Sequence, residues 1–394
     1  MNIRFLQSSL YIIFGNMALG IIFAILNFIL MPFLTAKLMS LAGVAFLIGM
    51  GIAAFAAPFL GKLSDKIGNR EIFIILLFLI NVFSCLGIPI STKSILFCCA
   101  VIFVTTAFTL QPIYSSFVAD RSLPKIRAKR YGITIGTTTF TSFLASLVIK
   151  TVFDVSPERT FSILALAILG LLIPFSIGTL QGNRFQKSFA PNDQDAFSGN
   201  ILKDLRLRRF FLSQAGAWFA IGGIFPLLTS FLRDALDFSL GSASLLTGFF
   251  SLLSGCATLS AGYLLKYSSK ELLYYSTCML LAIIFSILAT ILGLPVPVLT
   301  KRIVTIFILS LLYLTVGTFY PLGPTILSTL APSEIRGKAF GVNHTFIIMS
   351  QGIAVQYFTL LLLRFGFLTV LISGALSGVL AALFFKQTVD KRDP

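Results

Sequence analysis

The chain has 394 residues, of which 57% are hydrophobic and only 11% are charged, whereas a soluble domain carries about 25% charged residues. This composition excludes an ordinary soluble protein and indicates an integral membrane protein. The formal net charge is +16, but the basic residues do not gather in one soluble segment, as a nucleic-acid partner would require.

Apolar runs long enough to cross a bilayer as a helix, which takes roughly 20 residues, recur along the chain. We predict an all-α membrane protein with twelve transmembrane helices, at residues 9–34, 41–60, 72–90, 94–119, 131–150, 160–180, 210–232, 240–263, 272–296, 303–331, 339–363 and 365–385. The last two come from one apolar run at 339–385. That run is too long for a single helix, and only Arg364 and Gly366 break it.

Lys and Arg residues are distributed unevenly between the two sets of predicted loops. Of the 30 Lys and Arg residues, 22 lie at the two termini or in the loops that follow even-numbered helices. With twelve helices, all of these segments lie on the same side of the membrane. Cytoplasmic loops carry an excess of Lys and Arg, so we expect both termini to lie in the cytoplasm. The first apolar stretch is too long for the core of a signal peptide, and we treat it as a retained helix.

The chain contains an internal repeat. The matching pairs are "GKLSDKIGNRE" (61–71) with "GYLLKYSSKE" (262–271), and "IRAKRYG" (126–132) with "IRGKAFG" (335–341). Two six-helix halves of like orientation follow, at residues 1–180 and 209–394. The polar segment 181–208 contains Pro, Gly and charges of both signs, which is typical of a linker, and we place it in the cytoplasm.

The segment at 61–71 carries five charges in eleven residues, between apolar runs that carry none. It resembles the loop signature of the major facilitator superfamily, G-x-L-x-D-x-x-G-R-[RK], between the second and third helices. Asn69 stands in place of the first basic residue of that signature. The resemblance covers essentially the whole chain and implies two halves related by a parallel pseudo-twofold repeat, as in secondary transporters.

The same resemblance implies a conformational latch at this loop. In the family, the loop acid latches the two halves on the cytoplasmic side, and glycines allow helices and a tight loop to approach closely. The resemblance assigns to this latch Gly61, Asp65, Gly68, Arg70 and Arg127. Arg127 is the candidate partner of Asp65. The alternative is a solvated loop whose charge serves topology alone.

Ionisable residues are nearly absent from the interiors of the predicted helices, since all 14 acids lie in loops or at helix ends. Proton-coupled drug exporters of the superfamily usually carry an arginine in the fourth helix and a G-P-x-x-G-G pattern in the fifth, and neither occurs here. His344, the sole histidine, is a candidate proton carrier because its free pKa lies near 6.5. The alternative for His344 is a structural role at a helix start.

Neutral polar and aromatic residues remain to line a cavity. In the family, the first, fourth, seventh and tenth helices face the central cavity, with help from the fifth and eleventh. The predicted substrate-binding residues are Asn16, Asn27, Gln111, Tyr114, Thr138, Gln214, Trp218, Tyr320, Asn343 and Gln351. The repeat places Gln351 at the position of Ser142. Each residue has a packing alternative, because hydroxyls bond to their own helix, amides join helices, and Trp often lies at the lipid interface.

We therefore expect a secondary transporter that moves a small neutral or weakly polar organic solute by alternating access. Its compact size and short loops resemble bacterial exporters of drugs or sugars, which favours efflux across the bacterial inner membrane. The alternatives are an importer of a sugar, nucleoside or amino acid, and a transport-inactive sensor or lipid-handling protein. We expect a monomer in a lipid bilayer with a proton as the possible coupling ion. No motif predicts an enzyme, a cofactor, a metal site or a nucleic-acid partner.

Overall fold

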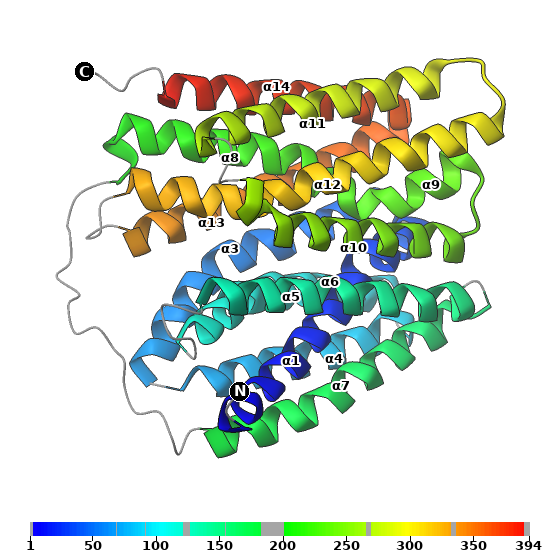
Figure 1. Cartoon of the computed structure of the whole chain (residues 1–394). Coiled ribbons are helices and arrows are strands. Elements are labelled where there is room, and N and C mark those ends of the chain that lie inside the picture. Colours follow the sequence, from blue (N-terminus) through cyan, green and yellow to red (C-terminus); the bar gives the residue numbers. More distant parts are fainter. Residues whose placement is uncertain are drawn as a thin grey trace. The chain divides into compact units, whose positions relative to one another are not determined.

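The computed structural model describes residues 3–67, 69–90, 92–120, 127–153, 155–182, 201–264, 269–331 and 336–389. All regular elements in these ranges are helical (Figure 1). Within the described ranges, twelve helical stretches are long and apolar enough to cross a membrane. This confirms the predicted all-α fold class and the twelve spans, with shifts of a few residues at their ends.

The helices fall into two compact units. Unit 1 comprises Met1–Gln194 and Ser239–Leu252, and unit 2 comprises Asp195–Phe238 and Leu253–Pro394. The first part of unit 1 contains the elements α1 (Ile3–Ala24), η1 (Ile25–Leu30), α2 (Met31–Leu38), α3 (Leu41–Ile67), α4 (Arg70–Ile90), α5 (Lys93–Asp120), α6 (Arg127–Val152) and α7 (Pro157–Gly182).

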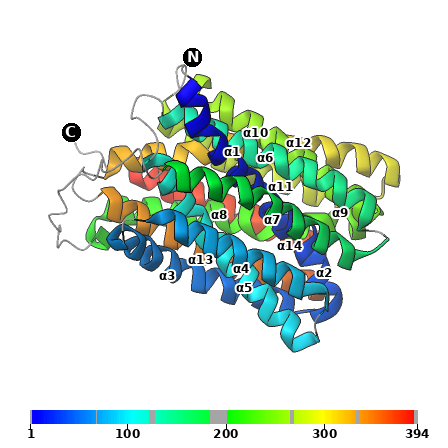
Figure 2. The same ribbon diagram turned by 90° about the horizontal axis from the view of Figure 1, so that it is seen from below.

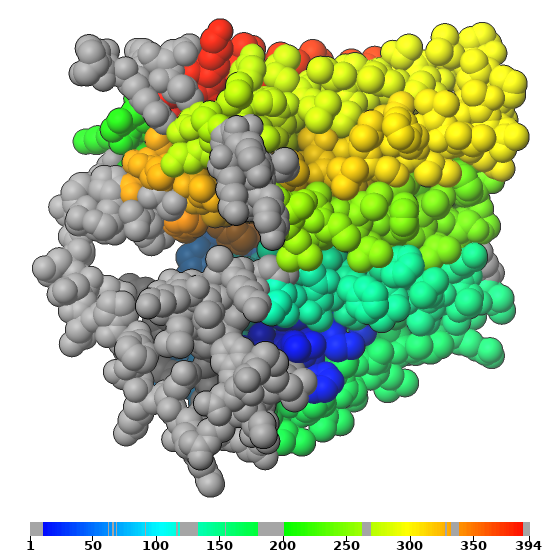
Figure 3. All heavy atoms as spheres, viewed as in Figure 1, coloured from blue at the N-terminus to red at the C-terminus, as the bar shows by residue number. Residues whose placement is uncertain are grey.

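Unit 2 contains the later elements, except that the first half of α10 belongs to unit 1. These elements are η3 (Ile201–Lys203), α8 (Leu205–Ile224), η4 (Phe225–Leu227), α9 (Leu228–Leu236), α10 (Leu240–Leu264), α11 (Lys270–Gly293), α12 (Val298–Leu330), α13 (Arg336–Phe365) and α14 (Phe367–Val389). The helix α11 packs against both α12 and α14. Figure 3 shows the side chains of α11 and α12 (yellow) packed together on one face of this unit.

The first and seventh spans are both interrupted near their middle. In the first span, η1 is a π-helical segment between α1 and α2. Pro32, in the first turn of α2, has no N–H to offer the carbonyl four residues earlier, and its ring clashes there. That carbonyl, of Phe28, accepts a hydrogen bond from Ser244 at 3.5 Å instead. In the seventh span, Pro226 lies in the short 3₁₀ segment η4 between α8 and α9.

The start of α8 and the end of α13 have clear local causes. Asp204 caps α8, because its carboxylate accepts hydrogen bonds from the backbone N–H groups of Arg206 (2.8 Å) and Leu207 (3.3 Å). The helix therefore begins at Leu205, inside the segment 181–208 that the sequence assigned to a linker. Between α13 and α14, Gly366 adopts φ +79°, a conformation that glycine takes without steric cost. This confirms the predicted break near Arg364 and Gly366.

The core of unit 1 contains an aromatic cluster between α1, α4, α5 and α7. Its members are Tyr11, Phe78, Tyr114, Phe117 and Phe175, with the paired ring centroids 5.8–6.4 Å apart. All five side chains are at most 6% exposed. Around them, α5 packs against α3 and α4 (Figure 2).

Unit 2 contains a corresponding aromatic cluster between α8, α11, α12 and α14. It consists of Phe210, Tyr274, Phe319 and Phe385, with the paired ring centroids 4.3–6.3 Å apart. Each helix that contributes is the repeat counterpart of one that contributes in unit 1. The two units are therefore built on the same internal plan, in agreement with the repeat found in the sequence.

Candidate functional site

Three of the predicted binding residues meet in unit 2, on facing sides of α8 and α12. We call Gln214, Trp218 and Tyr320 the aromatic–amide cluster. The indole N–H of Trp218 donates to Oε1 of Gln214 at 3.2 Å, one helical turn away. The Trp218 ring also meets the Tyr320 ring at a centroid distance of 5.2 Å and an interplanar angle of 63°.

The members of this cluster differ in exposure. Gln214 is 1% exposed and Tyr320 is 36% exposed, while Trp218 is half-buried. Gly323 makes room for the Gln214 side chain, because a Cβ at that position would lie 2.6 Å from Nε2 of Gln214. The cluster therefore combines two partly exposed rings with a buried amide.

The face formed by α8 and α12 is uncharged through its middle. No Asp, Glu, Lys or Arg occurs at residues 210–232 or 303–330. An ionised solute would normally require an opposite charge at its binding site in such a region. The arrangement is therefore suited to a neutral solute that offers hydrogen-bonding groups and an apolar surface.

The neighbouring helix α13 packs on α8 through small residues and hydrogen bonds. Gln351 lies over Gly222, where a Cβ would come within 2.2 Å of its side chain. Ser350 donates to the carbonyl of Ala215 at 2.6 Å. Gln351 is 7% exposed and Asn343 is 6% exposed, so both predicted binding residues lie mostly within the helix packing.

Unit 1 repeats this arrangement between α1 and α6. Ser142 donates to the carbonyl of Gly20 at 2.7 Å, and a Cβ at Gly20 would lie 2.5 Å from the Thr138 carbonyl oxygen. Thus Gly20 and Ser142 pack together as Gly222 and Gln351 do in unit 2. The predicted equivalence of Ser142 and Gln351 agrees with this packing.

Asn16 and Thr138 also lie at the contact between α1 and α6. The Thr138 hydroxyl donates to the carbonyls of Thr134 (3.0 Å) and Asn16 (3.4 Å). The Asn16 side chain is fully buried, and neither its oxygen nor its nitrogen has a hydrogen-bond partner among the described residues. In this conformation, Asn16 forms no open binding surface, and the half-buried Thr138 is engaged in joining α6 to α1.

Tyr114 lies within the aromatic cluster of unit 1, away from any open surface. Its side chain is 1% exposed, its hydroxyl donates to the carbonyl of Ile12 at 2.6 Å, and its ring lies over Gly15. This arrangement does not support the prediction that Tyr114 contacts a solute. Its hydroxyl and ring are already engaged in joining α5 to α1.

The remaining predicted residues are carried by α5, η1 and α13. Gln111 is exposed on α5, and Asn27 is half-buried in the π-helical segment η1. His344 is half-buried on α13, and its Nε2 has no hydrogen-bond partner among the described residues.

The latch residues lie at the edge of what the structure describes. The side chains of Asp65 and Arg127, and all of Gly68, lie outside the described residues. Arg70 begins α4. Among the residues that the structure describes, none comes within 4 Å of a Cβ at Gly61 apart from its own helix and chain neighbours.

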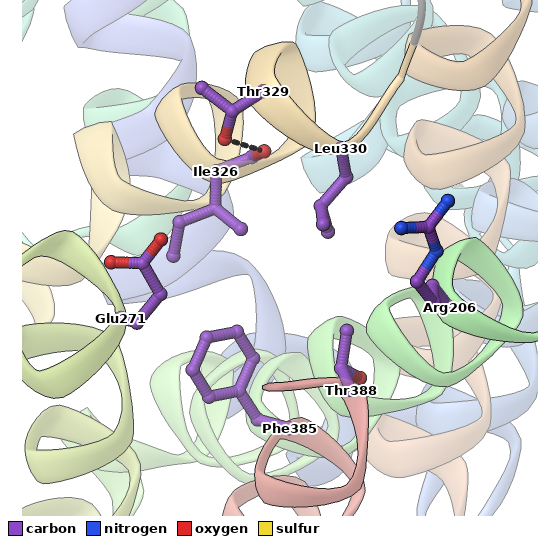
Figure 4. A pocket seen from close by; sticks show the side chains of 7 residues that line it. All are labelled: Arg206, Glu271, Ile326, Thr329, Leu330, Phe385 and Thr388. Atoms are coloured by element: carbon purple, nitrogen blue, oxygen red, sulfur yellow. Dashed lines mark hydrogen bonds between the residues drawn. The ribbon is translucent and has the colours of Figure 1, made fainter. Parts of the chain in front are cut away.

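A small cavity lies at the end of unit 2 where α8 and α11 begin. The residues that line it are Arg206, Glu271, Ile326, Thr329, Leu330, Phe385 and Thr388 (Figure 4). Its volume is about 30 Å³, and a cavity needs roughly 10–15 Å³ to hold one water molecule, so it has room for a few waters at most. The cavity is therefore too small for an organic solute, and the aromatic–amide cluster remains the stronger candidate site.

Sequence reasoning missed a second aromatic contact, at the interruption of the seventh span. Phe225 in η4 stacks on Tyr313 of α12, with the ring centroids 4.8 Å apart and the planes at 6°. Pro226 was the available signal for the interruption, because proline disrupts a helix interior. Among the described residues, no group of three or more His, Cys, Asp or Glu side chains could hold a metal ion.

Comparisons with known proteins agree with this architecture. The family model described as Major Facilitator Superfamily matches residues 11–347 and, in a second overlapping match, residues 210–394. No protein of curated function matches the chain in sequence. The fold is similar to three solved transporter structures, which share only 14–15% sequence identity with the chain.

The first of these structures is the nucleoside transporter NupG, with 14% identity, a TM-score of 0.74 and coverage of 97% of this chain and 100% of that one. The D-xylose–proton symporter has 15% identity, a TM-score of 0.72 and coverage of 98% of both chains. A bacterial homologue of the iron transporter ferroportin, in an outward-facing state, has 15% identity, a TM-score of 0.69 and coverage of 99% and 100%.

Proposed function

Because this chain belongs to the major facilitator superfamily, we propose that it moves a small neutral or weakly polar organic solute across the bacterial inner membrane by alternating access. We further propose that export is the net direction. In this proposal, residues 1–180 and 209–394 are the two six-helix halves, and both termini lie in the cytoplasm.

The aromatic–amide cluster is the observation that carries the proposal. Its two partly exposed rings can cover an apolar surface of a solute, and the buried amide of Gln214 holds the Trp218 ring in place by accepting the hydrogen bond from its indole N–H. The helices that hold it are uncharged through their middle, so a neutral solute is bound without burying an unpaired charge.

The interruptions of the first and seventh spans support the same conclusion. Transporters of repeated architecture commonly bind substrate beside discontinuous helices at corresponding positions of the two halves. Here η1 and η4 interrupt counterpart spans. The contact of Phe225 with Tyr313 joins η4 to α12, the helix that also carries Tyr320.

Solute flux through purified protein in liposomes tests the proposal. D-xylose and uridine are suitable first solutes, with a panel of neutral drug-like compounds beside them. Trp218→Ala is expected to weaken binding about tenfold or more, because it removes one aromatic surface and leaves the amide of Gln214 without its partner. Flux of an organic anion in preference to every neutral solute would contradict the proposed substrate class.

Direction and coupling require separate measurements. Export predicts that a deletion strain becomes sensitive to the solute, whereas an importer predicts that the strain fails to grow on it. Collapse of an imposed pH gradient across the liposomes tests the proton as coupling ion. If downhill transport then continues at the same rate, the protein is a facilitator.

Two further roles complete the proposal, of which only the latch comes from the family resemblance. We propose that Asp65 and Arg127 form a latch that is made in one conformation and broken in the other. His344 is the proposed proton carrier, because it is the only histidine and its Nε2 has no hydrogen-bond partner among the described residues. A variant such as His344→Gln that retains full pH-gradient coupling would exclude this role.

A further inference from the structure

A set of buried polar side chains leads to the amide of Gln214. We call Ser213, Gln214 and Tyr274 the polar relay, and each is at most 1% exposed. The Ser213 hydroxyl donates to the carbonyl of Ala381 on α14 at 2.7 Å, and it lies 3.1 Å from the Tyr274 hydroxyl on α11. The Gln214 amide is within reach of that same Tyr274 hydroxyl. The polar relay therefore links α8, which also carries Trp218, to α11 and α14.

The backbone carbonyl at the end of the polar relay fixes the direction of its hydrogen bonds. A hydroxyl has one proton, and Ser213 uses its proton on Ala381, so the Ser213 oxygen can only accept from Tyr274. The Tyr274 hydroxyl then donates to Ser213, and its own oxygen is left to accept. The NH₂ end of Gln214 has no hydrogen-bond partner of standard geometry among the described residues. The Tyr274 oxygen is therefore the acceptor that this NH₂ end faces.

The other end of the amide gives the same orientation independently. The indole N–H of Trp218 donates and cannot accept, and Oε1 of Gln214 receives it at 3.2 Å. The two ends of an amide have nearly the same shape, so packing alone does not select between them. Here the Ala381 carbonyl and the Trp218 indole both require the oxygen toward Trp218. The orientation of the amide is thus determined from both sides.

The Tyr274 hydroxyl occupies a fixed position in the core of unit 2. Its ring packs against Phe385, with the centroids 4.3 Å apart, and against Phe319 at 5.1 Å. The Cys278 thiol is another polar group beside this hydroxyl, but sulfur is a weak acceptor. The Ser213 oxygen is therefore the preferred acceptor for the Tyr274 proton.

We propose that Ser213 and Tyr274 are positioning residues that hold the Trp218 ring in the candidate site through the amide of Gln214. Both are fully buried, so each acts through the next hydrogen bond and not by touching a solute. A ring that is already held binds a solute with a smaller loss of side-chain freedom. The inference rests on the proposed function and deepens it, because it names the residues that prepare the site for its solute.

The direction of the hydrogen bonds can be tested without any solute. The chain has one tryptophan, so the ultraviolet resonance Raman spectrum of the indole reports on Trp218 alone. We expect the signature of a hydrogen-bonded indole N–H in the unaltered protein. In Ser213→Ala, the Tyr274 proton loses its acceptor and can go to the amide oxygen of Gln214 instead. The amide then turns its NH₂ end toward the indole, and the signature should be lost.

A second substitution should restore the lost signature. Tyr274→Phe keeps the ring but removes the competing donor, so in the double variant Ser213→Ala/Tyr274→Phe the amide oxygen should return to Trp218. A role of Ser213 in packing alone predicts no recovery, because the double variant has lost a further buried polar group. A signature that persists in Ser213→Ala, or that stays absent in the double variant, would overturn the proposal.

The matched control is a serine that joins the same two helices outside the polar relay. Ser377 on α14 donates to the carbonyl of Gly216 on α8 at 2.7 Å. Ser377→Ala therefore removes an equivalent contact and should leave the indole signature unchanged. If Ser377→Ala abolishes the signature as well, loosening of the helix contact is the cause and the role assigned to Ser213 is wrong. Thermal unfolding of each variant confirms that the protein is folded.

Tyr274→Phe by itself provides a test that does not depend on the folding of Ser213→Ala. The amide oxygen should stay on the indole in this variant, so the Raman signature should remain. The amide loses its hold on the other side, however, and the fluorescence anisotropy of Trp218 should decay faster than in the unaltered protein. An unchanged decay would show that Tyr274 does not position Trp218.

Solute binding distinguishes this inference from the proposed function. In calorimetric titrations with D-xylose and uridine, Ser213→Ala should weaken the binding of a probe about fivefold, the share of one hydrogen bond, and the double variant should restore it. If the spectra follow the expected pattern but no neutral solute is moved in liposomes, the transport proposal fails and the roles of Ser213 and Tyr274 stand. If transport is intact while Ser213→Ala keeps the indole signature, transport stands and this inference is overturned.

Discussion

Gly20 is the position in unit 1 where a single added methyl group should have a large effect. A Cβ there would lie 2.5 Å from the carbonyl oxygen of Thr138 and 2.8 Å from Cβ of Thr141, whereas ordinary Cβ contacts lie at 3.4–4 Å. The helices α1 and α6 would have to separate to admit it. That movement would also stretch the hydrogen bond from Ser142 to the Gly20 carbonyl, now 2.7 Å long.

The expected magnitude follows from these two contacts. Overpacking costs about 1 to 3 kcal/mol, and the weakened hydrogen bond costs about 1 kcal/mol. The greater helix propensity of alanine returns about 1 kcal/mol. We therefore expect Gly20→Ala to lower the free energy of unfolding by about 1 to 3 kcal/mol. The matched control is Gly170→Ala on α7, where nothing lies within 4 Å of a Cβ, so that variant should be about 1 kcal/mol more stable.

Buried cysteines provide an assay for each unit. Cys85 in unit 1 and Cys278 in unit 2 are both 0% exposed, so each reacts with a thiol-reactive dye only when its surroundings open. Single-cysteine proteins that retain one or the other report the two units separately. With Cys85 as reporter, Gly20→Ala should lower the melting temperature by about 2 to 12 °C. Equal melting temperatures for the Gly20 and Gly170 variants would refute the packing argument.

Three further predictions concern strain, capping and the proposed latch. Met39 has φ 54° and ψ −123° at the end of α2, so Met39→Gly should stabilise unit 1 by about 1 kcal/mol; an unchanged melting temperature would show that this backbone is not strained. Arg302 donates to the carbonyls of Leu236 (2.6 Å) and Asp237 (2.7 Å), so Arg302→Ala should destabilise unit 2 by about 1.5 to 3 kcal/mol, measured with the cysteine reporter of that unit. Asp65→Asn should reduce turnover more than solute binding in liposome assays, and full turnover would exclude a latch.

The sequence predicted the helical framework because the bilayer imposes length and apolarity on every span. It also predicted the break near Gly366 and the equivalence of Ser142 with Gln351. These features depend on local composition and on the internal repeat, both of which can be read along a single chain.

Burial inside the bundle could not be predicted in the same way. A side chain that faces lipid and one that faces the protein core are both apolar, so hydropathy alone does not separate them. Tyr114 is the example, since its ring packs against aromatic rings of α4, of α7 and of its own helix α5. In contrast to Tyr114, the rings of Trp218 and Tyr320 in unit 2 are partly exposed. Their positions on α8 and α12 bring them beside Gln214.

The π-helical segment η1 was missed for a different reason. Pro32 lies two residues before the end of the predicted helix 9–34, so from the sequence it suggests a helix end and not an interruption, and the surrounding residues are apolar throughout. The seventh span contains Pro226 in a similar apolar context. Only comparison of the two spans shows that each is interrupted at a corresponding place.

The uncharged middles of α8 and α12 have an electrical consequence. Moving one elementary charge through a membrane potential of 100 mV involves about 2.3 kcal/mol, which would make the rate of a conformational change depend on voltage. Residues 210–232 and 303–330 carry no such charge, so a rearrangement of these helices without solute should proceed at the same rate at any membrane potential. An electric current that accompanies transport would then measure the charge of the solute or of its coupling ion directly.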